Sequence, residues 1–115
     1  MARYTCSFTV AVDVERLRQL LAEVFKSCNL VLMCDRNDYM MARQHPGQVS
    51  LSKLVTVEVL IDNATSTQTA TRINLVIKNE ELALQVDNHC HHIFELVKQS
   101  IIENYNWQLT ENIAR

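Results

Sequence analysis

The most site-like group in the chain is the tetrapeptide His89, Cys90, His91 and His92. Imidazole and thiolate are good ligands for zinc or copper, and histidines three or four residues apart share one face of a helix. On a helix that begins at Asn88, His89 and His92 share a face, whereas Cys90 lies on the core side. A single metal ion would contact at most two of these side chains. We therefore expect no bound metal and no other cofactor, with His89 and His92 as the candidate ligands if a metal is present.

Two other interpretations of the same cluster remain open. The first is a solvated first helical turn, in which His91 points toward Glu95 and the polar side chains face water. The second is an acid–base or anion-contacting role, because a helix N-terminus favours neutral imidazole.

The chain contains four cysteines, but their presence alone does not indicate a catalytic nucleophile. Nucleophilic catalysis requires a thiol paired with an oriented base, for which Cys34 beside Asp35 or Cys90 among its histidines would be the candidates. Cys6 lies on the apolar side of a strand and Cys28 on the apolar stripe of a helix, where free cysteine behaves as a small hydrophobe. We expect four reduced structural thiols, no catalytic residue and a reducing, cytoplasmic location.

Glycine is almost absent, because the chain contains one glycine and one proline, adjacent at Pro46 and Gly47. Phosphate-binding and dinucleotide-binding loops need several glycines for their backbone conformation and close approach. Those functions are excluded. The pair instead predicts a turn between two strand-like runs.

Length and charge limit the remaining functions. The chain has 115 residues, 48% of them hydrophobic, and a net charge of −2. Its Lys and Arg residues are scattered, so it lacks the basic stripe that nucleic acids or anionic membranes require. No apolar stretch approaches the roughly 20 residues of a membrane span, and the first residues do not resemble a signal peptide. We expect neither nucleic acid nor membrane as a partner.

Hydrophobic periodicity predicts the strands. Alternation with a period of two indicates strands at residues 3–12, 51–62 and 69–78. Short runs at 30–34 and 39–44 predict two more, paired as a hairpin.

Two amphipathic helices accompany these strands. Apolar residues three and four positions apart predict one helix over residues 14–28, with Asp13 as its N-cap and Asn29 at its end. A second runs from Asn88 to about Tyr105. Residues 82–86 fit either a strand, which is favoured, or the approach to that helix.

The order β-α-β-β-β-β-α predicts a single α+β domain over residues 1–115, with 106–115 as a C-terminal tail. The economical arrangement is an antiparallel sheet of about five strands with both helices packed on one face. In element order this layout resembles TBP-like and other helix-on-sheet domains. The expected core contains Phe8, Leu21, Phe25, Val57, Leu75, Phe94 and Val97.

Such a layout leaves the second face of the sheet uncovered. Aliphatic, basic and Thr side chains would share that face, a mixture typical of protein interfaces. The tail adds aromatic residues, which dominate interface energetics. The expected interface residues are Leu54, Leu60, Arg72, Val76 and Trp107.

These observations favour a small cytosolic, non-enzymatic interaction or assembly module. It would bind itself, as a homodimer or larger homo-oligomer, or another protein through the uncovered sheet face. The alternative is a small-ligand or metal-binding protein or enzyme that uses the cluster at residues 89–92.

Overall fold

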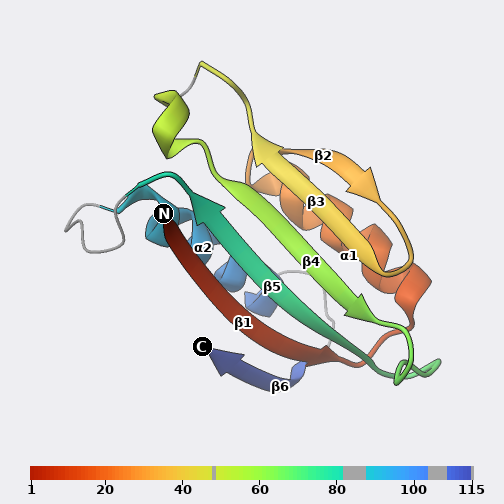
Figure 1. Ribbon diagram of the computed structural model, residues 1–115. Coiled ribbons are helices and arrows are strands. Elements are labelled where there is room, and N and C mark those ends of the chain that lie inside the picture. The colour runs from red at the N-terminus through yellow and green to blue at the C-terminus, as the bar shows by residue number, and fades with distance from the viewer. Residues whose placement is uncertain (48, 82–87, 104–108, 115) are drawn as a thin grey trace.

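The computed structural model describes residues 1–47, 49–81, 88–103 and 109–114, the last segment by its backbone alone. Figure 1 shows a twisted sheet in front of two helices. In chain order the elements are β1 (Ala2–Val10), α1 (Val14–Ser27), β2 (Leu30–Asp35), β3 (Tyr39–Gln44), the short 3₁₀ helix η1 (Leu51–Lys53), β4 (Thr56–Asp62), β5 (Thr71–Asn79), α2 (His89–Glu103) and β6 (Leu109–Ala114).

The strands form one sheet in the order β2-β3-β4-β5-β1-β6, and every neighbouring pair is antiparallel. The predicted α+β class and the order β-α-β-β-β-β-α are confirmed. The structure adds one strand, because the backbone of Leu109–Ala114, expected as part of a tail, pairs with β1 as β6.

Local sequence signals determine where α1 begins and ends. The Asp13 side chain accepts a hydrogen bond from the backbone N–H of Arg16 at 2.8 Å, as an N-cap residue should. At the other end Asn29 adopts a φ of 60°, a left-handed conformation that Asn tolerates better than most residues. Both predicted helix-terminating residues are therefore confirmed.

Both helices cover the same face of the sheet (Figure 1). Helix α1 contacts β2, α2 contacts β1 and β5, and the two helices touch each other. The side chains between these layers form one apolar cluster, which includes all seven expected core residues. The period-two alternation places that cluster on one side of every central strand.

The segment between β3 and β4 departs from expectation. A strand was predicted from residue 51, but Leu51–Lys53 form a 3₁₀ turn and β4 begins at Thr56. Backbone hydrogen bonds from Lys53 to Ser50 and from Leu54 to Leu51 close this turn. The ambiguous residues 82–86 lie outside the described residues.

The position of Phe94 in the core gives a stability prediction. Its ring is buried and stacks on Tyr4, with 5.5 Å between centroids. Replacing Phe94 by alanine should lower the free energy of unfolding by about 3–5 kcal/mol, because it leaves a cavity in the packed interior. Urea unfolding measures this value.

The control for that experiment lies on the same helix. Leu96 is 48% exposed, and Leu96→Ala should change the free energy of unfolding by less than about 0.5 kcal/mol. Equal losses in the two variants would contradict the assigned orientation of α2.

Candidate functional site

The sheet face opposite the helices carries the side chains that alternate with the core. No described helix or strand crosses it (Figure 1). Strand register aligns its residues in three rows across β3, β4, β5 and β1, and we call these twelve residues the open face. The rows are Arg43, Thr56, Lys78 and Arg3, then Met41, Glu58, Val76 and Thr5, then Tyr39, Leu60, Asn74 and Ser7.

Glu58 connects the rows of the open face. Its carboxylate forms an ion pair with Lys78 Nζ at 2.5 Å and accepts a hydrogen bond from the Tyr39 hydroxyl at 2.7 Å. The bond from Lys78 holds the pKa of Glu58 below its ordinary value; burial opposes this shift, and the bond from Tyr39 supports it. Burial, together with the bond to Glu58, raises the pKa of Tyr39 to about 12. The middle of the face is therefore a preorganised ionic network.

The first row is rich in cations. Arg3 lies directly opposite Lys78, and like charges in that relation repel each other. Glu58 offsets this repulsion, since it pairs with Lys78 and also feels the charge of Arg3. Arg43, at the other end of the row, is exposed, and its guanidinium makes no hydrogen bond or ion pair with any residue that the structure describes. One cation of this row is thus available to a partner.

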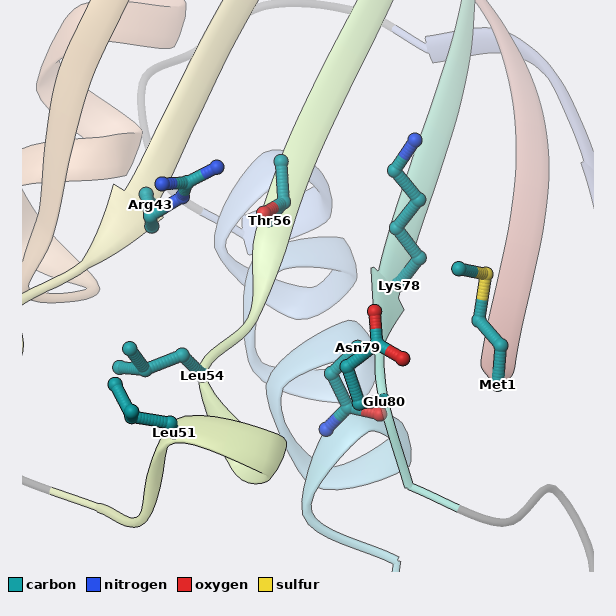
Figure 2. Close-up of a pocket in the computed structure, with 8 residues that line it drawn as sticks. All are labelled: Met1, Arg43, Leu51, Leu54, Thr56, Lys78, Asn79 and Glu80. Atoms are coloured by element: carbon teal, nitrogen blue, oxygen red, sulfur yellow. The ribbon is translucent and has the colours of Figure 1, made fainter.

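A hollow of about 310 Å³ lies at the end of the open face, beside η1. Figure 2 shows Leu51 and Leu54 on one wall, Asn79 and Glu80 on the opposite wall, and Arg43 and Lys78 on either side of Thr56. Met1 completes the lining. This hollow combines an apolar wall with two cations and one carboxylate.

A second hollow, of about 270 Å³, occupies the centre of the face between β4, β5 and β1. Ser7 Oγ donates a hydrogen bond to Asn74 Oδ1 at 2.5 Å on its floor. Its lining residues are Arg3, Thr5, Cys6, Ser7, Leu60, Asn74 and Val76. Both hollows are open to solvent, and protruding side chains of a partner would fit into them.

The predicted interface residues occupy different environments. Leu60 is 45% exposed in the third row of the face, whereas Val76, in the second row, is only 7% exposed. Leu54 is half-buried on the wall of the first hollow, and Arg72 is exposed on β5 beyond the third row. Trp107 lies outside the described residues. The exposed apolar surface on β4 and β5 therefore centres on Leu60.

The histidine cluster has a structural role at the start of α2. His89 Nε2 lies 3.0 Å from Gln44 Oε1 on β3, and the ring is half-buried. For His89 this differs from the solvated first turn that was one interpretation of the sequence. His91 packs edge-on against the Tyr4 ring and lies 3.6 Å from Glu95, as its predicted direction requires. Gln44 Oε1 also accepts a hydrogen bond from the backbone N–H of Val55, which fixes the Gln44 side chain. The His89 ring is directed inward because its partner is this side-chain amide.

A buried carboxylate caps the same helix. Glu81 Oε1 accepts hydrogen bonds from the Cys90 N–H at 2.9 Å and from Asn79 Nδ2 at 2.5 Å, and Glu81 Oε2 accepts from the His89 N–H. Burial by itself would raise the pKa of Glu81, but these bonds outweigh it and hold the pKa below its ordinary value. Asn88 completes the cap by accepting from the His91 N–H. A carboxylate eight residues before the first residue of a helix is a weak capping signal, so the sequence indicated Glu81 only as a turn or cap residue.

Three of the four cysteines lie in the interior, as expected for structural thiols. Cys6, Cys28 and Cys90 are buried, and none of the four cysteines forms a disulfide. Burial raises the pKa of Cys6 to about 11 and that of Cys90 to about 12, which suppresses the reactive thiolate. Across residues 1–47, 49–81 and 88–103, no three His, Cys, Asp or Glu side chains group as metal ligands would.

No protein-family model matches the chain, and no curated protein matches its sequence. Within the described residues, neither helix is long and apolar enough to cross a membrane. The fold alone therefore defines the class of protein: an α+β domain with two helices on one face of an antiparallel sheet and a charged, uncovered face on the other.

The cap formed by Glu81 gives a pH-dependent prediction. Its pKa is lower in the folded chain than the ordinary 4.5, so the ionised form stabilises the fold above about pH 4.5. Glu81→Gln should lower the free energy of unfolding at pH 7 by about 1–2 kcal/mol. The difference between wild type and variant should shrink as the pH falls through the folded pKa. Chemical denaturation over a pH series measures both effects.

The neighbouring Glu80 provides the matched control for that series. Its side chain is exposed, and Glu80→Gln should change stability little at any of these pH values. A constant difference between wild type and Glu81→Gln from neutral to acidic pH would show that Glu81 does not cap α2 as a carboxylate.

The histidines give a prediction on metal content. We expect protein purified without added metal to carry no stoichiometric metal by elemental analysis. Replacing His89 and His92 together by alanine should cost about 1 kcal/mol, because the bond between His89 and Gln44 is lost. His92→Ala alone should cost less, since that side chain is exposed. One zinc ion per chain, lost in the double variant, would contradict the structural role.

Proposed function

We propose that this chain is a non-enzymatic protein-interaction module whose open face binds a partner chain. The observation that carries the proposal is the asymmetry of the sheet, because both helices cover one face and leave Leu60 exposed on the other. Tyr39 and Asn74 lie directly opposite Leu60 on the neighbouring strands, and Tyr39 is held by its hydrogen bond to Glu58 in the next row. An apolar contact beside ordered polar groups is the usual anatomy of a protein interface.

The first partner to test is a second copy of the same chain. Two open faces related by a twofold axis would bury the same patch, including Leu60, on both copies, as an isologous contact requires. The described edge strand β2 offers a second route, although its bulge between Leu32 and Cys34 disturbs regular pairing there. The open face is therefore the preferred surface for a homo-oligomer.

A cytoplasmic location belongs to the same proposal. None of the four cysteines forms a disulfide, and three of them pack inside the domain as small apolar side chains. This use of cysteine suits a reducing compartment.

Leu60→Arg tests the open face directly. Wild type should self-associate at high micromolar concentration, and the variant should weaken that association by about tenfold or more, because it places a charge in the contact. Sedimentation equilibrium and light scattering after size exclusion measure the change.

Leu96→Arg is the matched control, since Leu96 is exposed to a similar degree on the opposite side of the domain. Its association should equal that of wild type. A monomeric wild type would refute self-assembly, and dissociation by Leu96→Arg but not by Leu60→Arg would refute the open face as the contact.

A further inference from the structure

The row of cations and the hollow beside η1 form a continuous surface with a defined chemistry. Arg43, Lys78 and Arg3 lie in register on β3, β5 and β1, and Thr56 on β4 fills the remaining position. Three strand spacings of about 4.8 Å separate the two ends of the row, a span of about 14 Å. Leu51 and Leu54 adjoin its Arg43 end (Figure 2).

The charges of this surface are incompletely compensated. Three cations face two carboxylates, and Glu58 already pairs with Lys78. Glu80 lies on the wall of the hollow opposite Leu51 and Leu54, and Arg43 has no partner in the described part of the chain (Figure 2). The surface therefore attracts anions even though the whole chain carries a net charge of −2.

From this arrangement we infer that the open face binds an acidic peptide segment of a partner protein. The carboxylates of the segment would lie on the cation row, and one apolar side chain, such as leucine, would fill the hollow beside η1. The inference rests on the proposed function, since it names the chemistry of a foreign protein partner at the same face, the alternative there to a second copy of this chain. Carboxylates recognise guanidinium groups through paired, charge-assisted hydrogen bonds, and the exposed Arg43 is placed for this contact.

The dimensions favour a peptide over other anions. A small free anion would contact one end of the row, whereas an extended peptide at about 3.3 Å per residue spans its 14 Å with four or five residues. An anionic membrane would have to approach a chain of net negative charge that has only three aligned cations on this face. The apolar wall of Leu51 and Leu54 adds a contact that a purely electrostatic partner would not use.

The test uses a fluorescein-labelled peptide with leucine at its first position, glutamate at the third and fifth, and serine between them, so that all three side chains share one face of an extended chain. A second peptide carries glutamine in place of every glutamate. Fluorescence anisotropy should show saturable binding of the acidic peptide, weaker binding of the glutamine peptide and loss of affinity at high salt. Amide shifts in an NMR titration should map to β3, β4 and β5.

Two charge variants have opposite expected effects. Arg43→Gln should weaken the acidic peptide by about three- to tenfold, because it removes the unpaired cation. Glu80→Gln should tighten binding by about two- to threefold, because it removes a competing carboxylate from the hollow. Arg16→Gln, the same chemical change on α1 behind the sheet, should stay within about twofold of wild type.

Several outcomes would overturn the inference. Equal affinities of wild type and Arg43→Gln, with shifts still on the open face, would leave the proposed interaction module intact and refute its acidic specificity. Shifts confined to α1 and α2 would refute both. Arg43-dependent binding to phosphatidylserine vesicles, without binding of the acidic peptide, would replace the peptide by a lipid surface. Absence of any peptide binding at millimolar concentration would refute the inference outright.

Discussion

Burial of one sheet face beneath two helices is the constraint on which the rest of this structure depends. The inner residues of β1, β4 and β5 form a continuous apolar surface, and α1 and α2 together cover it. Because the side-chain period of a strand is two, each residue committed to this core sends its neighbours to the other face. The position of the open face therefore follows from the geometry of the core, and no further sequence signal is needed to specify it.

Strand register converts that consequence into a chemical surface. Residues far apart in the sequence, such as Arg3 and Lys78, become direct neighbours when β1 and β5 pair. Glu58 offsets their mutual repulsion by pairing with Lys78, and the Tyr39 hydroxyl on the next strand donates a hydrogen bond to its carboxylate. The open face is therefore held by electrostatics across four strands, while packing beneath it holds the strands themselves.

The start of α2 shows how buried polar groups support the same framework. At this end Glu81 and Asn88 accept hydrogen bonds from backbone N–H groups of the first helical turn. Gln44 contacts the side chain of His89, the first helical residue, and so connects α2 to β3. Asn79, at the end of β5, bonds to Glu81. A helix end buried without such partners would be costly. These contacts explain why a cluster rich in metal-ligand residue types serves the architecture here: His89 and His91 each have a protein partner.

The sequence by itself determined the class of fold, the helix boundaries at Asp13 and Asn29, and the side of each central strand that faces the core. These features depend on local periodicity and capping, which neighbouring residues encode. Tertiary structure decided the features that depend on contacts between distant segments. The register of β4 and β5 placed Glu58 diagonally across from Lys78, where the two side chains form an ion pair. Val76, which was expected on an exposed surface, is buried, and His89 lies against Gln44. It also added β6, because an edge of β1 was open for pairing, and no local pattern in residues 106–115 specifies that partner.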